Sequence, residues 1–278
     1  MLTETITPTA AATTASPVGL TEKAIWSHDR LPAPFRLNFT SRLGGTSTGP
    51  FDSLNLALHV GDDPRRVRDN RRRVLSSVNI RENAPVIAQQ VHGKLCVRVD
   101  KDDAGRGTFT HTDAVEGADA LLTTQRGLPL MAFSADCLLV ALADPTAGVL
   151  AVAHAGWRGL AAGVLEETVR AMRDAGADPA RLHAVGGPSI GPCCFEVGSD
   201  VVSAIGPQYA SVREGGKPTI DLREAARDRL LAAGVSLERI GIDTACTCCR
   251  EDQFFSHRRA TRQGLRNTGR MALLAWIE

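Results

Sequence analysis

Three short apolar runs, separated by only a few residues, constrain the fold of this chain more than any other feature. They are Leu130–Phe133, Leu138–Leu142 and Val149–Ala153. Pro129 precedes the first run, a position where a strand tolerates proline, and Gly148 precedes the third. Runs of this length are typical of buried strands, although periodicity alone does not exclude helix. The sequence therefore predicts a core built on a sheet.

Further helix and strand signals surround these runs. The helix signals are an Asp-Pro N-cap, an apolar side chain every fourth residue, and an Asp-x-x-Glu capping pair. The predicted elements are a helix that begins at Asp63-Pro64, one helix over residues 160–175, one that begins at Asp221 and is closed by Gly234, and strands over residues 240–245 and 271–277. Because helices and strands do not alternate regularly, we predict an α+β fold with a mixed sheet core.

Charge and composition argue against several classes of protein. Lys and Arg number 32 and Asp and Glu number 31, a balance that disfavours a nucleic-acid or polybasic membrane binder. Aromatic residues make up only 4% of the chain, which disfavours a base-stacking surface. No apolar run approaches the roughly 18 residues of a membrane span. No Pro/Ser/Gly-rich linker divides the chain, so we predict a single domain over residues 21–278.

The N-terminal segment and the cysteines indicate the compartment. Residues 1–20 are rich in Thr, Ala and Pro and lack the features of a signal peptide, so we predict a disordered tail. The seven cysteines are then expected to be reduced thiols in the cytoplasm. Cys193-Cys194 and the Cys246–Cys249 segment could in principle form a structural zinc site, and Cys246 and Cys249 have zinc-pair spacing. No second such pair accompanies them, however, and adjacent cysteines are poorly placed to chelate one ion. We expect these thiols to line the core or a pocket.

Three potential metal ligands stand at the ends of probable strands. They are His92 in a QVHG segment, Cys137 in an ADC segment and His154 in an HAGWRG segment. Imidazole and thiolate together favour zinc or copper, and three protein ligands leave a fourth position for water or substrate. A single His or Cys beside an apolar run is, however, more often an ordinary core or surface residue. Spacing alone therefore does not require a metal.

Several charged residues near these segments could bind a substrate. Arg158 lies at an expected strand-to-helix turn, where backbone N–H groups and its guanidinium would favour phosphate or carboxylate. Arg42 could hold phosphate or be a solvated turn residue. Asp136 could orient a ligand, act as an acid or base, or cap a turn, and in a strand it would face away from Cys137. The further arginines that could line an anion-binding pocket or pair with surface acids are Arg71, Arg258, Arg259 and Arg270.

Together with other segments, these motifs closely resemble the multicopper polyphenol oxidase (laccase-domain) family, also described as the YfiH-like purine nucleoside phosphorylase family. The matching segments are TSRLGG at 40–45, SLNL at 53–56, HVGD at 59–62, Asn70-Arg71, QVHG at 90–93, ADC at 135–137, HAGWRG at 154–159, GPSIGPCCFEVG at 187–198, Cys246-Thr247, FFSHRR at 254–259 and TGRMA at 268–272. One departure is Leu139, which precedes Val140 where the family usually has proline.

The resemblance implies a fold, a metal and an activity. The fold would be a mixed β-sandwich surrounded by helices, and one zinc ion per chain would be held by His92, Cys137 and His154. Family members are described as cleaving adenosine, inosine or methylthioadenosine with phosphate, and as deaminating adenosine. The chain has seven His and no His-x-His pair, too few and too scattered for a multicopper oxidase, so we expect a mononuclear site. Copper could still replace zinc there.

The leading prediction is a zinc-dependent purine nucleoside phosphorylase with adenosine deaminase activity in addition. Phosphate held by Arg42 and Arg158 would attack the ribose, and a proton donor or the metal would stabilise the departing base. Four alternatives remain open. The chain could be a cysteine hydrolase, with Cys137 as nucleophile and His92 or His154 as base, which looks like the sites of deamidating toxins. It could also be an amidohydrolase editing a cell-wall precursor, a copper polyphenol oxidase or a non-catalytic metal-binding module.

Overall fold

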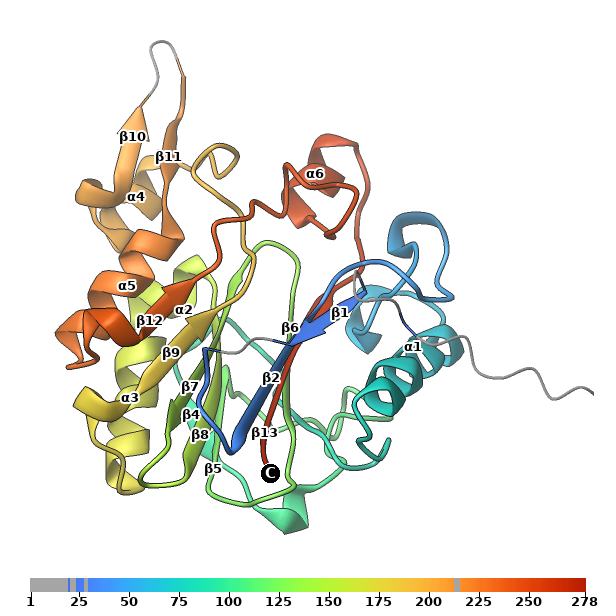
Figure 1. Ribbon diagram of the computed structural model, residues 1–278. Helices are drawn as coiled ribbons and strands as arrows, with labels where there is room; N and C mark the ends of the chain where they lie inside the picture. Colours follow the sequence, from blue (N-terminus) through green and yellow to red (C-terminus); the bar gives the residue numbers. More distant parts are fainter. Residues whose placement is uncertain (1–19, 21–23, 28–29, 213–215) are drawn as a thin grey trace, which may run out of the picture.

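Two β-sheets packed face to face form the centre of the molecule (Figure 1). The structure is a computed structural model that describes residues 20, 24–27, 30–212 and 216–278. In spatial order, the five-stranded sheet contains β1 (Ile25–Ser27), β2 (Phe35–Thr40), β13 (Met271–Ile277), β6 (Leu130–Ser134) and β3 (Val86–Ile87). The six-stranded sheet contains β12 (Ile240–Ile242), β9 (His183–Gly186), β7 (Leu138–Asp144), β8 (Val149–Ala155), β5 (Ala120–Thr123) and β4 (Cys96–Arg98).

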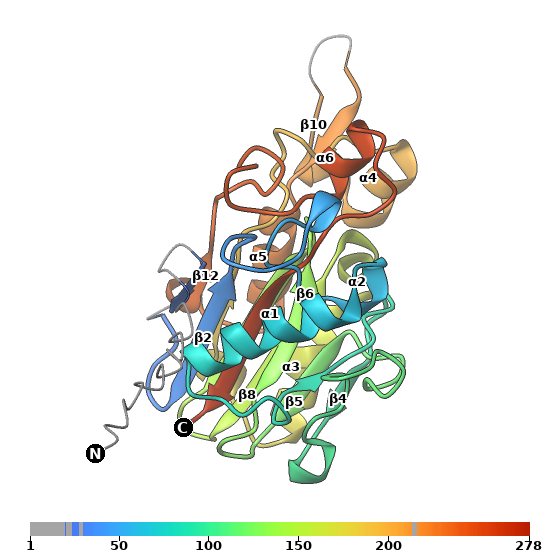
Figure 2. The ribbon, with the colours of Figure 1, turned by 90° about the vertical axis from the view of Figure 1, so that its right-hand side faces the viewer.

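Helices cover the outer face of each sheet. The five-stranded sheet is crossed by α1 (Pro64–Ser77), as Figure 2 shows from the side. The helices of the opposite layer are α2 (Trp157–Ala162), α3 (Val164–Asp174), α4 (Ser199–Ile205) and α5 (Leu222–Ala232). Beyond this layer extends a hairpin of β10 (Ala210–Val212) and β11 (Pro218–Ile220), and α6 (His257–Arg262) lies past the end of β6 in both views. The predicted fold class, an α+β single domain with a mixed β-sandwich surrounded by helices, is confirmed.

The layered packing explains why the strands are continuously apolar. In β13, Leu273 and Ala275 face the six-stranded sheet, whereas Ala272 and Leu274 face α1. The same alternation divides β7 and β8 between the inter-sheet core and the helical layer. Since neither face of these strands meets water, neither face needs polar residues. The strands predicted over residues 130–133, 138–142, 149–153 and 271–277 are confirmed as β6, β7, β8 and β13.

The predicted helix starts are also confirmed. The Asp63 side chain accepts a hydrogen bond from Arg65 N at 2.9 Å at the start of α1. The Asp221 side chain caps α5 by accepting from Arg223 N at 2.9 Å. Residues 240–245 were predicted to form one strand, but β12 covers only Ile240–Ile242, because the chain turns there toward a loop rich in cysteine.

The single helix predicted over residues 160–175 is wrong. The structure instead has two helices, α2 and α3, divided at Gly163, whose φ is +90°. This left-handed conformation ends α2, and it strongly favours glycine because a Cβ would be strained there. The apolar repeat with a period of four residues crosses the break, so periodicity could not reveal it.

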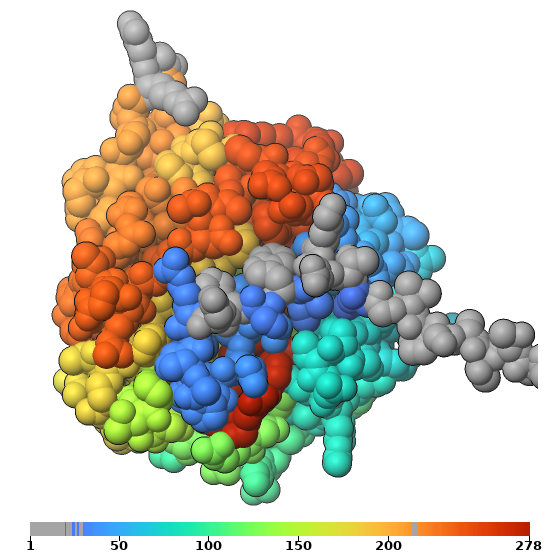
Figure 3. Space-filling model, viewed as in Figure 1, coloured from blue at the N-terminus to red at the C-terminus, as the bar shows by residue number. Residues whose placement is uncertain are grey.

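The two ends of the described chain lie in one sheet. β13 pairs with β2 on one side and with β6 on the other, and Figure 3 shows dark red C-terminal atoms between blue N-terminal atoms and the cyan atoms near α1. The predicted tail, residues 1–20, lies outside the described residues apart from Leu20, and the domain boundary at residue 21 stays a prediction. No helix in the described part of the chain has the length and apolarity needed to cross a membrane.

Candidate metal and substrate site

The structure brings His92, Cys137 and His154 together. His92 lies in the loop after β3, Cys137 ends the turn between β6 and β7, and His154 lies near the end of β8. β7 and β8 pair with Leu139 opposite His154, so the turn before β7 meets the end of β8. One ligand atom from each of the three residues lies within 4.8 Å of the others. We call these residues the His–Cys–His site.

A glycine makes room for the sulfur in this site. A Cβ on Gly156 would lie 2.8 Å from Cys137 Sγ and 3.3 Å from His92 Cδ2. Real Cβ atoms essentially never come within 3.0 Å of a heavy atom elsewhere in the chain, so any side chain here would displace the sulfur or the imidazole. This close approach explains one glycine of the HAGWRG segment: it lets the three ligands come together.

Unusual backbone conformations gather around the site. Gln90, His92 and Asp136 have φ values of 60°, 62° and 96°, and Asn79 is the only other non-glycine residue with positive φ in the described ranges. Such conformations cost about 1–3 kcal/mol each and persist where surrounding contacts hold them. The Gln90 side chain, for example, donates to Phe133 O at 2.7 Å and accepts from Phe133 N at 2.8 Å. Strain concentrated in this way is typical of functional sites.

Asp119, which the sequence reasoning missed, orients two of the three ligands. Its Oδ1 accepts from His92 N and from His154 Nδ1, both at 2.9 Å, and its Oδ2 accepts from Gly93 N at 2.6 Å. An ionised carboxylate can only accept, so His154 Nδ1 carries a proton, and Nε2 is the nitrogen left to bind a metal. The available signal was an aspartate directly before the apolar segment Ala120–Leu122.

The charges of Cys137 and His154 depend on each other. Burial opposes ionisation of Cys137, but the charge of His154 and hydrogen bonds from His154 and His92 outweigh it and lower the pKa of Cys137 to about 6. Burial likewise opposes a charged His154, but the Cys137 thiolate and Asp119 raise the pKa of His154 to about 9. Near neutral pH the metal-free site therefore holds a thiolate beside an imidazolium.

This donor set fits a zinc ion. Two imidazoles and one thiolate are borderline-soft ligands, and three protein ligands leave one tetrahedral position open, as in catalytic zinc sites. The carboxylate behind His154 is the support that metal-bound histidines usually have. Among the described residues, histidines contribute to no other group of three potential ligands, so these histidines do not build a multicopper cluster.

The His–Cys–His site opens into a cavity of about 420 Å³. Its lining includes three aromatic side chains, three arginines and two further histidines. These residues are Phe133, Trp157, Phe195, Arg158, Arg258, Arg270, His59 and His257. Asp136 is the only carboxylate in the described lining. The excess of positive charge favours an anionic ligand, and the aromatic rings offer flat apolar walls.

The arginines reach the cavity from separate segments. Arg158, at the start of α2, is exposed, and its guanidinium carbon lies 4.3 Å from the Trp157 ring centroid. Arg258, from α6, lies 5.4 Å from the Phe195 ring centroid. Arg270 precedes β13 and donates to Thr268 O at 2.7 Å. Because α2 has only six residues, the guanidinium of Arg158 is a stronger anion-binding feature than the helix dipole.

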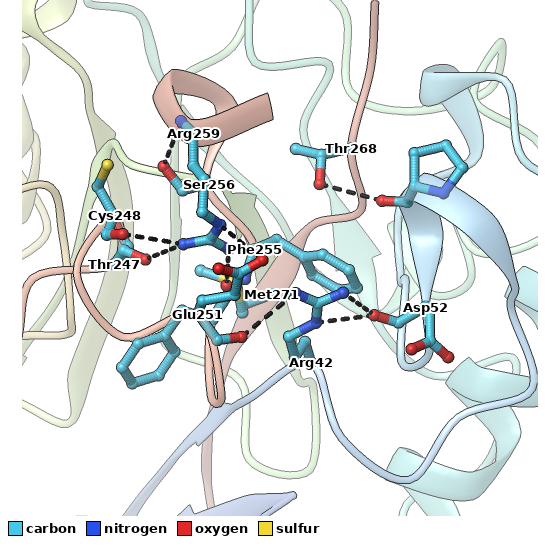
Figure 4. A network of polar contacts seen from close by, with 12 residues as sticks. Arg42, Asp52, Thr247, Cys248, Glu251, Phe255, Ser256, Arg259, Thr268 and Met271 are labelled. Carbon is cyan, nitrogen blue, oxygen red and sulfur yellow. Dashed lines mark hydrogen bonds and ion pairs between the residues drawn. The ribbon is translucent and has the colours of Figure 1, made fainter. Parts of the chain in front are cut away.

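Arg42 and Arg71 do not line this cavity. Figure 4 shows the Arg42 guanidinium donating to the backbone of Asp52 and Glu251, at 2.8 and 3.2 Å, and it lies 4.9 Å from the Phe255 ring centroid. Arg71 is buried and donates to three other carbonyl groups. Both guanidinium groups therefore tie loops together, and a phosphate role for Arg42 has no support from its position.

Asp136 lies in a turn, so the strand alternation used to place it does not apply. Its Oδ1 accepts from Thr247 Oγ1 and its Oδ2 accepts from Arg258 N, both at 2.7 Å. These bonds join the turn beside Cys137 to the start of α6 and to the Cys246–Cys249 loop. Because both carboxylate oxygens accept hydrogen bonds, Asp136 acts as a positioning residue and is poorly suited to be a free base.

Two histidines of the lining stay neutral. Burial, followed by the charge of Arg270, lowers the pKa of His59 to about 4. Burial and Arg270 lower the pKa of His257 in the same way. A neutral imidazole both donates and accepts a hydrogen bond, so either residue can contact a polar heterocycle.

The fold and the site define a helix-covered β-sandwich with a His–Cys–His ligand group above a cationic cavity. The chain belongs to the family described as multi-copper polyphenol oxidoreductase laccase, whose model matches residues 36–278. The resemblance found in the sequence is thereby confirmed.

Relatives share most of the chain. It is 40% identical over 246 residues to purine nucleoside phosphorylase YlmD of Geobacillus stearothermophilus, covering 86% of this chain and 88% of that protein. It is 38% identical over 243 residues to purine nucleoside phosphorylase YfiH of Escherichia coli, covering 86% and 92%. The crystal structure of Geobacillus stearothermophilus YlmD superposes with a TM-score of 0.84 at 37% identity, covering 88% and 93%. These relatives support a nucleoside-processing enzyme.

Proposed function

We propose that this protein is a zinc-dependent purine nucleoside phosphorylase whose zinc is held by His92, Cys137 and His154. One observation carries the proposal: the three potential ligands and three arginines open into the same cavity. A ligand group alone fits many reactions, whereas the arginines add a site for a phosphate anion. The relatives are named purine nucleoside phosphorylases, which supports a purine nucleoside as the other substrate.

Phosphate would bind to Arg158, Arg258 and Arg270, which replace Arg42 in this role. Guanidinium groups bind phosphate through short charge-assisted hydrogen bonds, and Arg158 is exposed at the cavity. Once held, a phosphate oxygen forms a bond to the anomeric carbon of ribose. The bond from that carbon to the base nitrogen breaks, and its electron pair leaves with the purine.

The purine would lie against the aromatic walls formed by Phe133, Trp157 and Phe195. The departing base needs a proton or another source of positive charge at a ring nitrogen. His257 and His59 are neutral and can donate a hydrogen bond there. A bound zinc ion supplies Lewis acidity and can activate water. The proposed substrates are adenosine, inosine and methylthioadenosine, with deamination of adenosine as a second reaction in the same cavity.

A second candidate function is a metal-free cysteine hydrolase. The observation in its favour is that Cys137, His154 and Asp119 follow one another as nucleophile, base and orienting carboxylate. The lowered pKa of Cys137 would supply the thiolate at neutral pH. In this case a metal would inhibit, because it would occupy the nucleophile.

The test is to incubate purified protein separately with adenosine, inosine and methylthioadenosine, with and without phosphate, and to separate the products by chromatography. Bound metal is counted in the same sample. From adenosine, the proposal predicts adenine and ribose 1-phosphate, formed only with phosphate, lost on removal of zinc and restored by its return. Formation of inosine would establish deamination. A zinc-loaded sample that leaves all three nucleosides intact would contradict the phosphorylase, and activity that survives chelation would favour the cysteine hydrolase.

A further inference from the structure

Four cysteines on two separate turns form a second group of potential ligands. Cys193 and Cys194 lie in the loop between β9 and α4, and Cys246 and Cys249 lie in the loop after β12. Their sulfur atoms all lie within 4.8 Å of one another, and all four thiols are free. Cys249 Sγ lies 3.5 Å from Cys193 Sγ and 3.4 Å from Cys194 Sγ. We call these residues the four-cysteine cluster.

The turns explain why adjacent cysteines can share one centre. In a strand, Cys193 and Cys194 would point to opposite faces. Here the chain folds back at Gly191, whose carbonyl accepts from Cys194 N and from Phe195 N, both at 3.0 Å. Both sulfurs therefore reach Cys249. Cys194 and Cys246 are buried in the core, in line with the expectation for these thiols, whereas Cys193 and Cys249 are exposed.

The distances are those of a tetrahedral metal centre. With zinc–sulfur bonds of about 2.3 Å, neighbouring sulfurs of a four-thiolate site lie about 3.8 Å apart. The two separations from Cys249 Sγ, 3.5 and 3.4 Å, are slightly shorter than that value, and all four sulfurs lie within 4.8 Å of one another, so small side-chain rotations suffice to enclose an ion. A backbone N–H also points at one sulfur, since Gly191 N donates to Cys246 Sγ at 3.2 Å. Such hydrogen bonds support thiolate ligands from behind.

The surroundings of the cluster carry positive charge. Four thiolates around a divalent ion leave a net charge of about −2, which needs nearby cations in a partly buried place. Helix α6 supplies them. Arg258 donates to Cys194 O at 3.0 Å, and Arg259 donates to Thr247 O at 2.9 Å and Cys248 O at 3.1 Å, the latter two shown in Figure 4.

We propose that Cys193, Cys194, Cys246 and Cys249 bind a structural zinc ion that fastens two loops beside the cavity. Four thiolates close the coordination sphere, so this ion has no open position for a substrate. One fastened loop carries Phe195 of the cavity wall, and the other carries Thr247, which holds Asp136. The zinc would thus keep the cavity in shape without taking part in the reaction. This inference is independent of the proposed activity.

The experiment is a zinc count on protein purified under reducing conditions, combined with cobalt spectroscopy. Wild-type protein should hold one zinc at each site, and Cys137→Ala should keep the ion of the four-cysteine cluster. Cys249→Ser should lose that ion, and Cys137→Ala/Cys249→Ser should lose both. Cys248→Ser is the matched control, because Cys248 belongs to the same turn but not to the cluster, and it should keep both ions. Cobalt in Cys137→Ala should give the thiolate charge-transfer absorption of a tetrahedral four-sulfur centre.

The wild-type count tests the proposal even if a variant fails to fold. A single zinc in the wild type that disappears in Cys137→Ala would overturn the proposal. So would equal loss of zinc in Cys248→Ser and Cys249→Ser. Thiols are also counted in denatured protein that was purified without reductant. A disulfide between two cysteines of the cluster would overturn the proposal, because those two sulfurs would then not be zinc ligands.

Discussion

The His–Cys–His site and the four-cysteine cluster lie near each other but differ in the number of potential metal ligands and in their surroundings. The first has three potential ligands, which would leave one tetrahedral position open, and it faces a cationic cavity. The second has four sulfurs and is surrounded by backbone of its own loops, including the N–H of Gly191, and by α6. The first is built on strand ends and strained loops, the second on two turns. Asp136 and Thr247 connect the two regions.

The difference suggests a division of roles, in which the His–Cys–His site serves the reaction and the four-cysteine cluster stabilises the loops beside it. A substrate needs access to the open site, and His92 is accordingly exposed. Strained residues such as Gln90 and Asp136 then need support from outside. A closed centre next to them can provide that support without competing for substrate. On this account, loss of the first site removes activity, and loss of the second mainly lowers stability.

The largest expected effect separates the two regions directly. Cys137→Ala should lower phosphorolysis by on the order of a thousandfold or more, because it removes both a ligand and the charge partner of His154. Cys249→Ser should change kcat/KM far less but lower the Tm by about 5 °C or more. Steady-state kinetics and thermal melts on both variants check this. A Cys249→Ser variant as inactive as Cys137→Ala, yet folded, would break the distinction.

A second test concerns the carboxylate behind the open site. Asp119→Asn keeps the shape of the side chain but removes the charge that fixes His154, so zinc affinity and activity should each fall by about 10- to 100-fold. Asp174→Asn, at an exposed ion pair with Arg170, is the control and should change neither. Competition with a chromophoric chelator measures the affinity. Unchanged zinc affinity in Asp119→Asn would show that the histidine needs no such support.

A smaller effect is expected at the arginines. Arg270→Lys keeps the charge but loses the planar fork, so KM for phosphate should rise by about tenfold with little change in zinc content. Arg42→Lys is the matched comparison, and it should leave this KM unchanged because Arg42 lies outside the cavity lining. Initial rates over a range of phosphate concentrations check both variants. A raised KM for phosphate in Arg42→Lys, with an unchanged KM in Arg270→Lys, would instead indicate that Arg42 binds phosphate.

The last prediction changes no residue and concerns the pH dependence of thiol alkylation, which should differ sharply between two cysteines. In metal-free protein the Cys137 thiol is protonated below its pKa and becomes the reactive thiolate as pH rises through about 6. Burial and the neighbouring thiols raise the pKa of Cys193 to about 11, so it should react only at much higher pH. Peptide mapping after iodoacetamide treatment gives both profiles, and zinc should suppress labelling of Cys137. A Cys137 midpoint near that of an ordinary thiol would contradict the pairing with His154.

The sequence predicted those parts of the molecule that depend on local patterns. Continuous apolar runs indicated strands buried on both faces, and the ligands at their ends proved to be neighbours, as the resemblance implied. Asp119 was missed because its role depends on two histidines that are distant along the chain. The four-cysteine cluster was set aside because adjacent cysteines are poor chelators in an extended chain, and the turn at Gly191 that brings both sulfurs to Cys249 is not apparent in the sequence. Gly163 was missed because a left-handed residue interrupts a helix without disturbing its apolar repeat.

Arginines were the least predictable residues. Arg42 and Arg270 both stand within two residues of a glycine and within a matched segment, so nothing local distinguishes them. Only the folded chain shows that Arg42 is occupied by backbone carbonyl groups and that Arg270 lines the cavity. A long flexible side chain can reach many partners, and its choice depends on which loops fold beside it.

The central claim is that zinc in the His–Cys–His site is required for phosphorolysis of a purine nucleoside. The most direct measurement is a zinc titration of metal-free Cys249→Ser protein, in which only that site has its full ligand set, with adenine release followed at saturating phosphate. The account predicts activity that rises in proportion to bound zinc and levels off at one ion per chain. Full activity before any zinc is added, or none after the site is filled, would contradict it.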